Sequence, residues 1–390
     1  MANVLFLYVK AVKPNIGGIG RITCTLGELF RTESYKVWYA ATGKPEGREF
    51  YDAQLFLTED DYSSKANYDQ LSKFILDNKI DVIINQIAPH KPVALLFERL
   101  KEEIGDRIKL VNCFHTSVLT PAYNYAYQVE YSLRKKNMGF VFHLLKWKPV
   151  KNYLIHSYIK HYRGLYKEAV ESADVNVVLN EGQEEELCKM IGVKSHPSIQ
   201  IIPNCVPTAK KSDAEKDNIV LWCGNFSCRV KRPDLMIDIW NYVSKKHTDW
   251  KLVMVGDGPD LEEMKGYAIS NKIARIEFTG RVNSTPYFEK AKIVCVTSTQ
   301  ESFSLGAVEG MQHSAPVVMF NSFTMAPKLV ENGENGFLVE DFNIKDFERK
   351  LALLMTDERT RIDMGKNARI KMVDYLPENI KERWKAIITI

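Results

Sequence analysis

Long apolar runs are absent from the sequence. A helix that crosses a membrane needs about 20 consecutive apolar residues, and no segment of this 390-residue chain approaches that length. The first apolar run, residues 4–9, has no basic segment before it and ends at Lys10, so it predicts a β-strand and not a signal peptide. We therefore expect a cytoplasmic protein and exclude integral membrane and secreted proteins.

Cysteine and net charge are also scarce. The seven cysteines lie mostly within apolar runs, and Cys223 and Cys228 have no second pair at the spacing of zinc ligands. This pattern predicts reduced, buried thiols without disulfides or zinc. A formal net charge of +4 is small for this length and does not favour a nucleic-acid partner. There is no D-x-D motif, so we expect no divalent metal and no other cofactor.

The sequence does contain an alternation of short β-branched runs with helical segments. This alternation is typical of doubly wound α/β domains, and 390 residues exceed what one hydrophobic core usually supports. A polar linker at 208–218 indicates two such domains. We expect strands at 3–9, 36–40, 52–57, 81–86, 108–113, 174–179 and 199–202 in the first domain, and at 219–223, 251–255, 275–279, 292–296 and 316–320 in the second.

The strongest candidate site follows the apolar run 292–296. This run predicts a buried parallel strand that turns directly into a helix. The first amides of such a helix have no partner within the helix and can bind a diphosphate without a metal. Glu301 and Glu309 would flank this anion, where carboxylates are suited to bind sugar hydroxyls. We expect the anion to be held at Ser304, Leu305 and Gly306.

Two segments of the first domain carry further candidate residues. Gly17 and Gly18 follow the first strand and let a ligand approach the amides at a helix start. Thr23 replaces the third glycine of a dinucleotide-binding loop, which argues against a dinucleotide cofactor. His115 follows the strand at 108–113, at the edge where α/β sheets bind ligands. An ordinary turn and a structural histidine are the alternatives here.

Residues 131–167 contain nine Lys or Arg and no Asp or Glu. Aromatic residues, including Trp147, lie between these cations. The composition is typical of a membrane-surface patch, of a nucleic-acid platform or of a solvated helical hairpin. Because no nucleic-acid motif is present, we expect peripheral contact with an anionic membrane, at the inner face of the cell membrane, and no nucleic acid.

The surroundings of Glu301 and Glu309 resemble a known family. The two glutamates have the spacing E-x₇-E, and they are accompanied by Phe303, by a strand-like run at 315–319 and by the segment 327–339. This combination is similar to the C-terminal domains of the retaining, nucleotide-sugar-dependent glycosyltransferases of family 4, also called glycosyltransferase group 1. The resemblance implies that Glu301 contacts the transferred sugar and that Glu309 contacts the ribose of the nucleotide.

The same resemblance assigns roles to residues outside this segment. It implies that Gly17 and Gly18 face the donor phosphates and the acceptor, and that His115 contacts the transferred sugar. It further implies that Arg281 and Val282 line the pocket for the base through their backbone groups.

The loop after the strand at 219–223 matches the family in part. The family usually has an arginine there and, a few residues later, a lysine. Lys231 matches the lysine and would neutralise the departing diphosphate. Asn225 replaces the arginine, and asparagine can donate hydrogen bonds but supplies no charge. Either Arg229 compensates or the leaving group is stabilised less, and a surface position is the alternative for Arg229 and Arg232.

We therefore expect the GT-B fold, in which two Rossmann-like doubly wound α/β domains face a central cleft. The expected parts are an acceptor domain at 1–207, a nucleotide-sugar-binding domain at 208–375 and a final helix at 376–390 that crosses back to the first domain. The expected enzyme is a hexosyltransferase that moves a sugar, with retention of anomeric configuration, from a UDP- or GDP-sugar to a saccharide or lipid-linked acceptor of cell-surface polysaccharide or glycolipid synthesis. The alternatives are a non-catalytic nucleotide-sugar-binding protein and a GT-B epimerase or phosphorylase.

Overall fold

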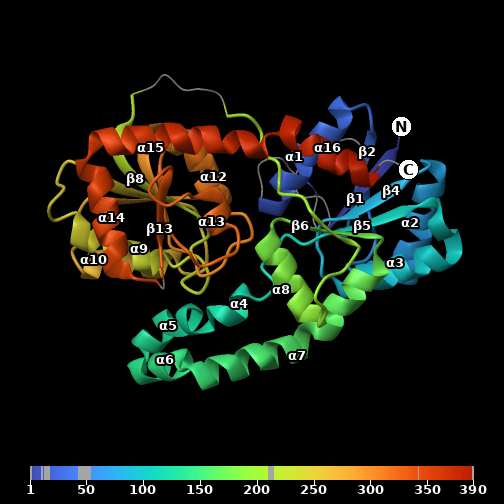
Figure 1. Ribbon diagram of the computed structural model, residues 1–390, viewed down its shortest axis with the longest axis horizontal. Coiled ribbons are helices and arrows are strands. Elements are labelled where there is room, and N and C mark those ends of the chain that lie inside the picture. The colour runs from blue at the N-terminus through green and yellow to red at the C-terminus, as the bar shows by residue number, and fades with distance from the viewer. Residues whose placement is uncertain are drawn as a thin grey trace. The chain divides into compact units, whose positions relative to one another are not determined.

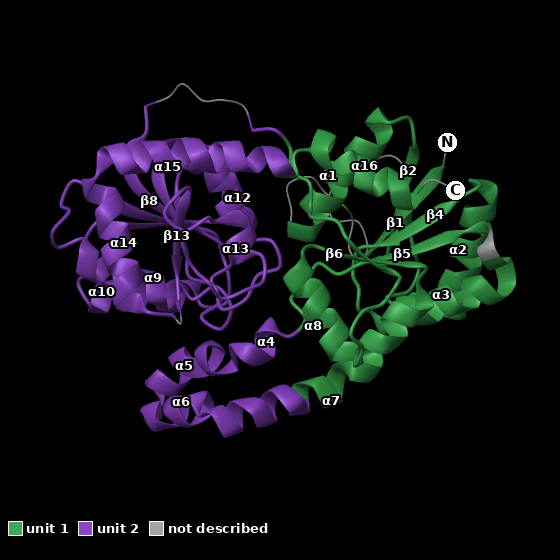
Figure 2. Ribbon diagram, in the orientation of Figure 1, with its two compact units in different colours: residues 1–118, 158–207, 375–390 green, residues 119–157, 208–374 purple. Residues whose placement is uncertain are grey.

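The computed structural model describes residues 2–9, 12, 18–42, 54–209, 215–340 and 342–388. These residues form two compact units, shown in green and purple in Figure 2. Unit 1 consists of Met1–Val118, Tyr158–Pro207 and Tyr375–Ile390, and unit 2 consists of Leu119–Ser157 and Thr208–Asp374. Each unit contains its own parallel sheet with helices packed on it (Figure 1).

The sheet of unit 1 has the strand order β3-β2-β1-β4-β5-β6-β7, and all neighbouring strands are parallel. This order is that of a Rossmann fold, extended at one edge. The strands overlap the predicted runs, although residues 52 and 53 of the run 52–57 lie outside the described residues. The bounds are β1 (Asn3–Tyr8), β2 (Lys36–Ala41), β3 (Gln54–Phe56), β4 (Val82–Asn85), β5 (Lys109–Cys113), β6 (Val175–Val178) and β7 (Ile199–Ile201).

The helices of unit 1 cover an apolar sheet. On one face, Phe30 stacks on Phe6, with ring centroids 5.8 Å apart, and meets Trp384 edge to face. Trp384 lies in the last helix, which therefore belongs to the core of unit 1. Asn180 caps α8 by accepting from the amide of Gln183. The bounds are α1 (Gly18–Thr32), α2 (Lys65–Asp77), α3 (Lys91–Ile104), η1 (Gly105–Arg107), α8 (Glu181–Ile191), α16 (Pro377–Ile388) and the later part of α7 (Lys148–Ser172).

The sheet of unit 2 has the order β10-β9-β8-β11-β12-β13, again parallel and again that of a Rossmann fold. Five of these strands match predicted runs, whereas β13 was not predicted. It begins at Gly336, where a Cβ atom would lie 2.4 Å from the backbone oxygen of Val317. The bounds are β8 (Asp217–Cys223), β9 (Lys251–Val255), β10 (Ile276–Gly280), β11 (Ala291–Val296), β12 (Val317–Phe320) and β13 (Gly336–Val339).

The helices of unit 2 come from two parts of the chain. Residues 119–157 group with unit 2, although the sequence placed them in a first domain of residues 1–207. Their long-range hydrogen bonds to the loops of unit 2, described below, account for this grouping. The bounds are α4 (Thr120–Tyr123), α5 (Tyr125–Lys135), α6 (Gly139–Lys146), the start of α7, α9 (Pro233–Val243), α10 (Leu261–Ser270), α11 (Thr285–Lys290), α12 (Leu305–Gln312), α13 (Ala326–Leu329), α14 (Ile344–Thr356), α15 (Glu358–Lys371) and η2 (Met372–Tyr375).

Candidate functional site

Two loops meet at the carboxyl edge of the sheet in unit 2. The strand order reverses between the neighbouring strands β8 and β11, and open α/β sheets bind their ligands at such a point. The loop after β8 carries Lys231, and the loop after β11 carries Glu301. The fold therefore brings to one place two segments that are 70 residues apart in the sequence.

Lys231 and Glu301 form an ion pair at this edge. Lys231 Nζ donates to Oε1 of Glu301, and Oγ of Ser298 donates to the same oxygen at 2.9 Å. The side chain of Lys231 is 25% exposed and that of Glu301 is 12% exposed, so both remain accessible to a ligand. The two residues of unit 2 for which a catalytic role was predicted are thus in direct contact.

The backbone around Lys231 is fixed to the neighbouring loop. The hydroxyl oxygen of Thr297 lies 2.9 Å from the carbonyl oxygens of both Lys231 and Arg232, which share its one hydrogen. The amide of Thr299 donates to the carbonyl oxygen of Val230 at 2.7 Å. Because these contacts join the loop after β8 to the loop after β11, the position of Lys231 relative to Glu301 is set by backbone as well as by charge.

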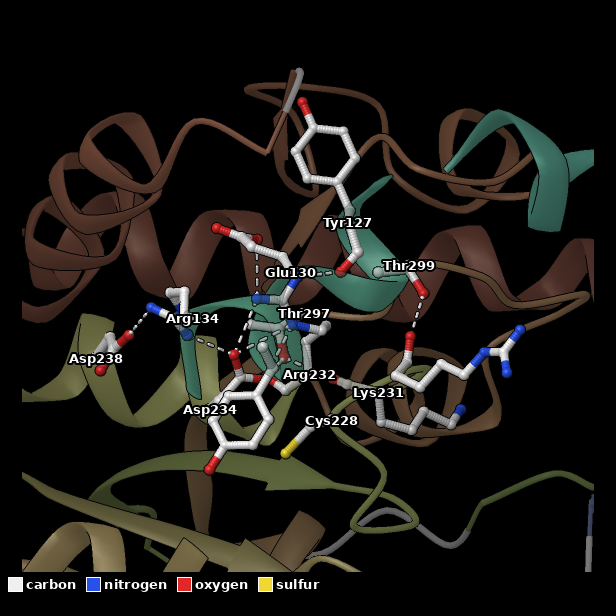
Figure 3. Close-up of polar contacts among 12 residues, drawn as sticks. Tyr127, Glu130, Arg134, Cys228, Lys231, Arg232, Asp234, Asp238, Thr297 and Thr299 are labelled. Carbon is white, nitrogen blue, oxygen red and sulfur yellow. Dashed lines mark hydrogen bonds and ion pairs between the residues drawn. The ribbon is translucent and has the colours of Figure 1, made fainter. Parts of the chain in front are cut away.

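Arg232 anchors the same loop from inside the protein. Its side chain is 0% exposed. Nη2 donates to Glu130 at 3.0 Å and to Asp234 at 2.9 Å, while Nη1 donates to the carbonyl oxygen of Tyr127 at 2.7 Å (Figure 3). Burial by itself lowers the pKa of the guanidinium. The carboxylates of Asp234 and Glu130 have the larger effect, so the pKa is raised. The interpretation of Arg232 as a surface charge is therefore wrong.

Helix α5 contributes further cations to this cluster. Arg134 donates from Nη2 to Asp234 at 2.8 Å and from Nη1 to Asp238 at 3.2 Å (Figure 3). Lys135 Nζ lies 2.6 Å from Oε1 of Glu263. Two of the basic residues in the segment 131–167 are thus used in ion pairs within unit 2, and they hold α5 against α9 and α10.

The predicted anion site lies at the start of α12. Ser304, just before the helix, has φ 61° and its side chain does not cap the helix. A Cβ atom at Gly306 would lie 3.2 Å from the carbonyl oxygen of Cys223, at the end of β8, so glycine lets the first turn approach that strand. Leu305 begins α12, and Glu309 lies further along the same helix. The predicted anion site and both glutamates are therefore together in unit 2.

Other predicted donor-binding residues lie on loops at the same sheet edge. Asn225 and Arg229 follow β8 and are exposed, and Nε of Arg229 donates to Gln128 at 3.4 Å. Arg281 and Val282 follow β10, with exposed fractions of 80% and 44%. Their exposure is compatible with contact to a ligand, and for Arg229 equally with the surface alternative, so the roles of these residues stay predictions.

The candidate residues of unit 1 surround the carboxyl end of its own sheet. His115 is buried directly after β5, and its Nε2 lies 2.7 Å from Oε1 of Gln86. An amide oxygen can only accept, so Nε2 carries the proton of the imidazole and Nδ1 is an acceptor. Within the described residues, Nδ1 is buried without a hydrogen-bond partner. Gly18 is the exposed first residue of α1, and Gly17 lies outside the described residues.

Burial also determines the charge of His115. Removal from water lowers the pKa of the imidazole from 6.5 to about 4. The side chain is therefore neutral near pH 7 and can accept a hydrogen bond from a ligand hydroxyl through Nδ1.

Comparison with solved structures defines the class of fold. TarM of Staphylococcus aureus, in a complex with Fondaparinux, alpha-GlcNAc-glycerol and UDP, superposes with a TM-score of 0.75 and 14% sequence identity over 100% of both chains. HepE of Anabaena, in complex with UDP and glucose, gives a TM-score of 0.73 and 16% identity, again over 100% of both chains. The chain has the GT-B fold, built from two Rossmann-like parts.

Sequence comparison narrows the class to a family. Residues 208–371 match the family described as "Glycosyl transferases group 1". An "Uncharacterized glycosyltransferase" of Haemophilus influenzae is 31% identical over 222 residues, which are 56% of this chain and 62% of that protein. The poly(ribitol-phosphate) alpha-N-acetylglucosaminyltransferase of Staphylococcus aureus is 28% identical over 53% of this chain and 42% of its own. Residues 208–371 thus match a group 1 glycosyltransferase domain, and the matches span about half of the relatives' length.

The described residues contain neither a membrane-spanning helix nor a cluster of metal ligands. None of the helices in the described ranges is both long enough and apolar enough to span a bilayer. In the same ranges, no three His, Cys, Asp or Glu side chains gather as ligands for a metal ion. The seven cysteines are free thiols, and all except the half-buried Cys223 are buried.

Proposed function

We propose that this protein is a retaining glycosyltransferase that moves a hexose from a nucleotide sugar to a saccharide or lipid-linked acceptor. The observation that carries the proposal is the ion pair of Lys231 and Glu301 beside the start of α12. A relative in Campylobacter jejuni, 27% identical over 45% of this chain and 49% of its own, is named for a transfer to an undecaprenol-linked saccharide. HepE has been crystallised with UDP-glucose. These relatives support a UDP-sugar donor and an acceptor in cell-surface polysaccharide or glycolipid synthesis.

The proposed chemistry depends on the departing nucleotide. When the bond between the anomeric carbon and the diphosphate oxygen breaks, the electron pair leaves with the nucleoside diphosphate. The first amides of α12, at Leu305 and Gly306, would hold that diphosphate, since they point along the helix axis with no partner in the helix. Lys231 would add the positive charge that stabilises it as it leaves. The acceptor hydroxyl then bonds to the anomeric carbon, and its proton passes to the diphosphate oxygen that has left.

The remaining predicted residues would hold the two sugars. We assign Glu301 to the transferred sugar and Glu309 to the ribose, because both carboxylates lie beside the start of α12 or on the helix itself. Nδ1 of His115 offers an acceptor for a hydroxyl of the transferred sugar. Asn225 and Arg229, both exposed after β8, would donate to the phosphates.

We further propose that transfer needs no divalent metal. The amides of α12 and Lys231 supply the charge compensation that a cation would otherwise give. The nearest sequence to a D-x-D motif is the acidic run 59–61, which follows β3 in unit 1 and not the proposed diphosphate site. Loss of activity with a chelator, restored by Mg²⁺ or Mn²⁺, would exclude this proposal.

A panel of nucleotide sugars tests the function. The protein is incubated with UDP- and GDP-sugars, and the nucleoside diphosphate released is measured with and without cell-surface saccharide acceptors. We expect at least one donor to be consumed, faster with an acceptor. Donor binding without release would instead indicate the non-catalytic nucleotide-sugar-binding protein. A changed sugar without a glycosidic product would indicate an epimerase.

We also propose that unit 2 touches an anionic membrane through α6 and the start of α7. No residue of α6 is buried. Phe140 is 71% exposed, Trp147 61% and Tyr153 71%, and the exposed Lys148 lies among them. Exposed aromatic and apolar side chains next to lysines are typical of surfaces that bind the headgroup region. Such contact would bring the enzyme to a lipid-linked acceptor at the inner face of the cell membrane.

Co-sedimentation with vesicles tests the membrane contact. We expect binding to vesicles with anionic lipid, weakened by salt because the attraction is screened. Phe140→Ser with Trp147→Ser should reduce that binding, whereas Leu353→Ser, at an exposed leucine of α14, should not. Equal binding to neutral vesicles, or no binding to either kind, would contradict the contact.

A further inference from the structure

A cavity of about 320 Å³ lies within unit 2, outside the predicted donor site. Its walls come from α4 to α7, from Asn321 directly after β12 and from Phe342 shortly after β13. Pockets that bind small molecules have volumes of about 300–1,000 Å³. The cavity is therefore large enough for a small ligand, and it lies at the same carboxyl edge of the sheet as Lys231 and Glu301.

The aromatic wall of this cavity is fixed by stacking. The rings of Tyr127 and Phe342 lie 4.1 Å apart between centroids, with an interplanar angle of 28°. Phe142 meets Tyr127 edge to face, with centroids 5.6 Å apart. Figure 3 shows that the Tyr127 ring points away from the Arg232 cluster. Rigid aromatic side chains of this kind give a pocket an apolar wall against which the C–H groups of a sugar ring can pack.

The polar groups of the cavity favour a negatively charged ligand. Lys146 Nζ lies 5.0 Å from the centroid of Tyr127 and 5.2 Å from that of Phe142, so cation–π contacts hold it at the wall. Lys151 is a second cation, and none of the described lining residues is acidic. Asn124 donates both of its amide hydrogens elsewhere, so it offers the cavity only a carbonyl oxygen, which can accept from a sugar hydroxyl.

We propose that this cavity binds a sugar unit that carries a phosphate or carboxylate group. The aromatic wall fits the sugar ring, the carbonyl oxygen of Asn124 fits a hydroxyl, and Lys146 and Lys151 fit the anion. A lipid chain would leave the two lysines and the carbonyl oxygen of Asn124 unused, and a free phosphate would leave the aromatic wall unused. The charged sugar is the ligand class that uses all of these groups.

The walls of the cavity are bonded directly to the loops of the predicted donor site. Asn124 Nδ2 donates to the carbonyl oxygen of Thr299 at 2.7 Å, two residues before Glu301. The carbonyl oxygen of Tyr127 accepts from Arg232, the residue after Lys231, at 2.7 Å. If the proposed function is correct, the bound sugar is a unit of the acceptor or product chain, held by the same unit that binds the donor. The expected substrate is then an anionic saccharide chain.

Calorimetry with small probes tests the site. The protein is first saturated with UDP so that the donor diphosphate site is filled, and it is then titrated with glucose 6-phosphate, glucuronate, glucose and inorganic phosphate. We expect at least one charged sugar to bind, and glucose and inorganic phosphate to bind about tenfold more weakly because each uses only part of the cavity. No binding of either charged sugar, or equal binding of inorganic phosphate, would overturn the proposal.

Variants locate the binding. Lys146→Gln and Lys151→Gln should each weaken binding of the charged sugar about tenfold, as loss of one charge-assisted hydrogen bond does. Lys148→Gln is the matched control, because this exposed lysine begins the same helix as Lys151 but does not line the cavity. Equal effects in all three variants would show a general surface attraction. If the protein binds anionic vesicles but neither charged sugar, the lysines belong to a membrane-binding surface, and the proposed sugar site would also be overturned.

Turnover separates this proposal from the proposed function. If the protein is a glycosyltransferase, Lys146→Gln should raise the KM for an anionic acceptor and leave the KM for the donor unchanged. If no donor gives nucleotide release but the charged sugar still binds, the proposed glycosyltransferase activity would be contradicted and the proposed sugar site would stand. If nucleotide is released but Lys146→Gln and Lys151→Gln leave the KM for the acceptor unchanged, the proposed role of the cavity in acceptor binding would be contradicted.

Discussion

Lys231 Nζ and the hydroxyl of Ser298 both donate to the same carboxylate oxygen, Oε1 of Glu301. In this arrangement the cation is neutralised by a neighbour that is predicted to bind the transferred sugar. A donor diphosphate carries more negative charge than one carboxylate, so it would compete for Lys231, while Glu301 would turn to sugar hydroxyls. Under the proposed function, the ion pair would keep both side chains in position until a donor replaces their mutual contact.

Removal of Lys231 should slow the chemical step. Lys231→Ala deletes the cation proposed to stabilise the leaving diphosphate, and loss of one such contact typically lowers kcat by a factor of about 100 or more. Nucleotide release measured at saturating donor gives kcat directly. Lys251→Ala is the control, because Lys251 is half-exposed at the opposite, amino end of β9. Unchanged turnover in Lys231→Ala would contradict the proposed role.

Asn225 allows the opposite test. Its side chain is exposed, and the loop uses its backbone oxygen, which accepts from the amide of Ser227 at 2.8 Å. Asn225→Arg should therefore keep the loop intact and add the charge that the family usually has here. We expect nucleotide release at an equal or higher rate. Inactivation of the variant, with unchanged thermal stability, would show that the loop requires asparagine.

Much of the fold could be predicted from the sequence because the buried strands are short β-branched runs. The strand β13 could not, since it has four residues, begins with glycine and depends on pairing with β12. The grouping of residues 119–157 with unit 2 could not be predicted either. It depends on contacts such as that of Asn124 with Thr299, 175 residues away, which no local pattern encodes.

Sequence motifs were sufficient to predict some residues of the candidate site. Residues whose position depends on ion pairs with distant parts of the chain were missed. Lys231 and Glu301 were found by spacing and context, and the structure places them in contact. Arg232 resembles any surface arginine in the sequence, because its partner Glu130 lies 102 residues earlier. One pattern could have indicated it: Asp234 follows two residues later, and the two side chains are hydrogen-bonded.

Loss of Arg232 should destabilise unit 2. Arg232→Met would leave Asp234, whose side chain is 1% exposed, with the partly exposed Arg134 as its remaining ion-pair partner, and it would remove the donor to Glu130. Breaking a buried pair costs about 3–5 kcal/mol of unfolding free energy, and because Arg134 remains, we expect a loss at the lower end, about 3 kcal/mol. Lys73→Met removes an exposed pair with Asp77 and should cost less than about 1 kcal/mol. Denaturant unfolding can be followed by tryptophan fluorescence. Equal stability of the two variants would contradict the anchoring role of Arg232.

His115 should make stability depend on pH. Burial lowers the pKa of this imidazole from 6.5 to about 4 in the folded state. Between these values the unfolded chain binds more protons, so the contribution is fully present above pH 6.5 and is lost as the pH falls toward 4. From about pH 7 to about pH 5, the wild type should lose about 2 kcal/mol more than His115→Gln. Identical pH dependence of the two proteins would show that His115 is not held neutral by the fold.

The central claim, transfer of a sugar from a nucleotide sugar, is tested most directly by NMR of the reaction mixture. The donor that the panel identifies is mixed with its acceptor and the protein, and the anomeric proton signals are followed together with the phosphorus signals. We predict that the donor signals decay as nucleoside diphosphate appears, and that the new glycosidic signal has the same anomeric configuration as the donor. Inverted configuration would contradict the retaining family. If the protein binds the donor but the donor signals stay unchanged, the proposal that the protein is an enzyme would be contradicted.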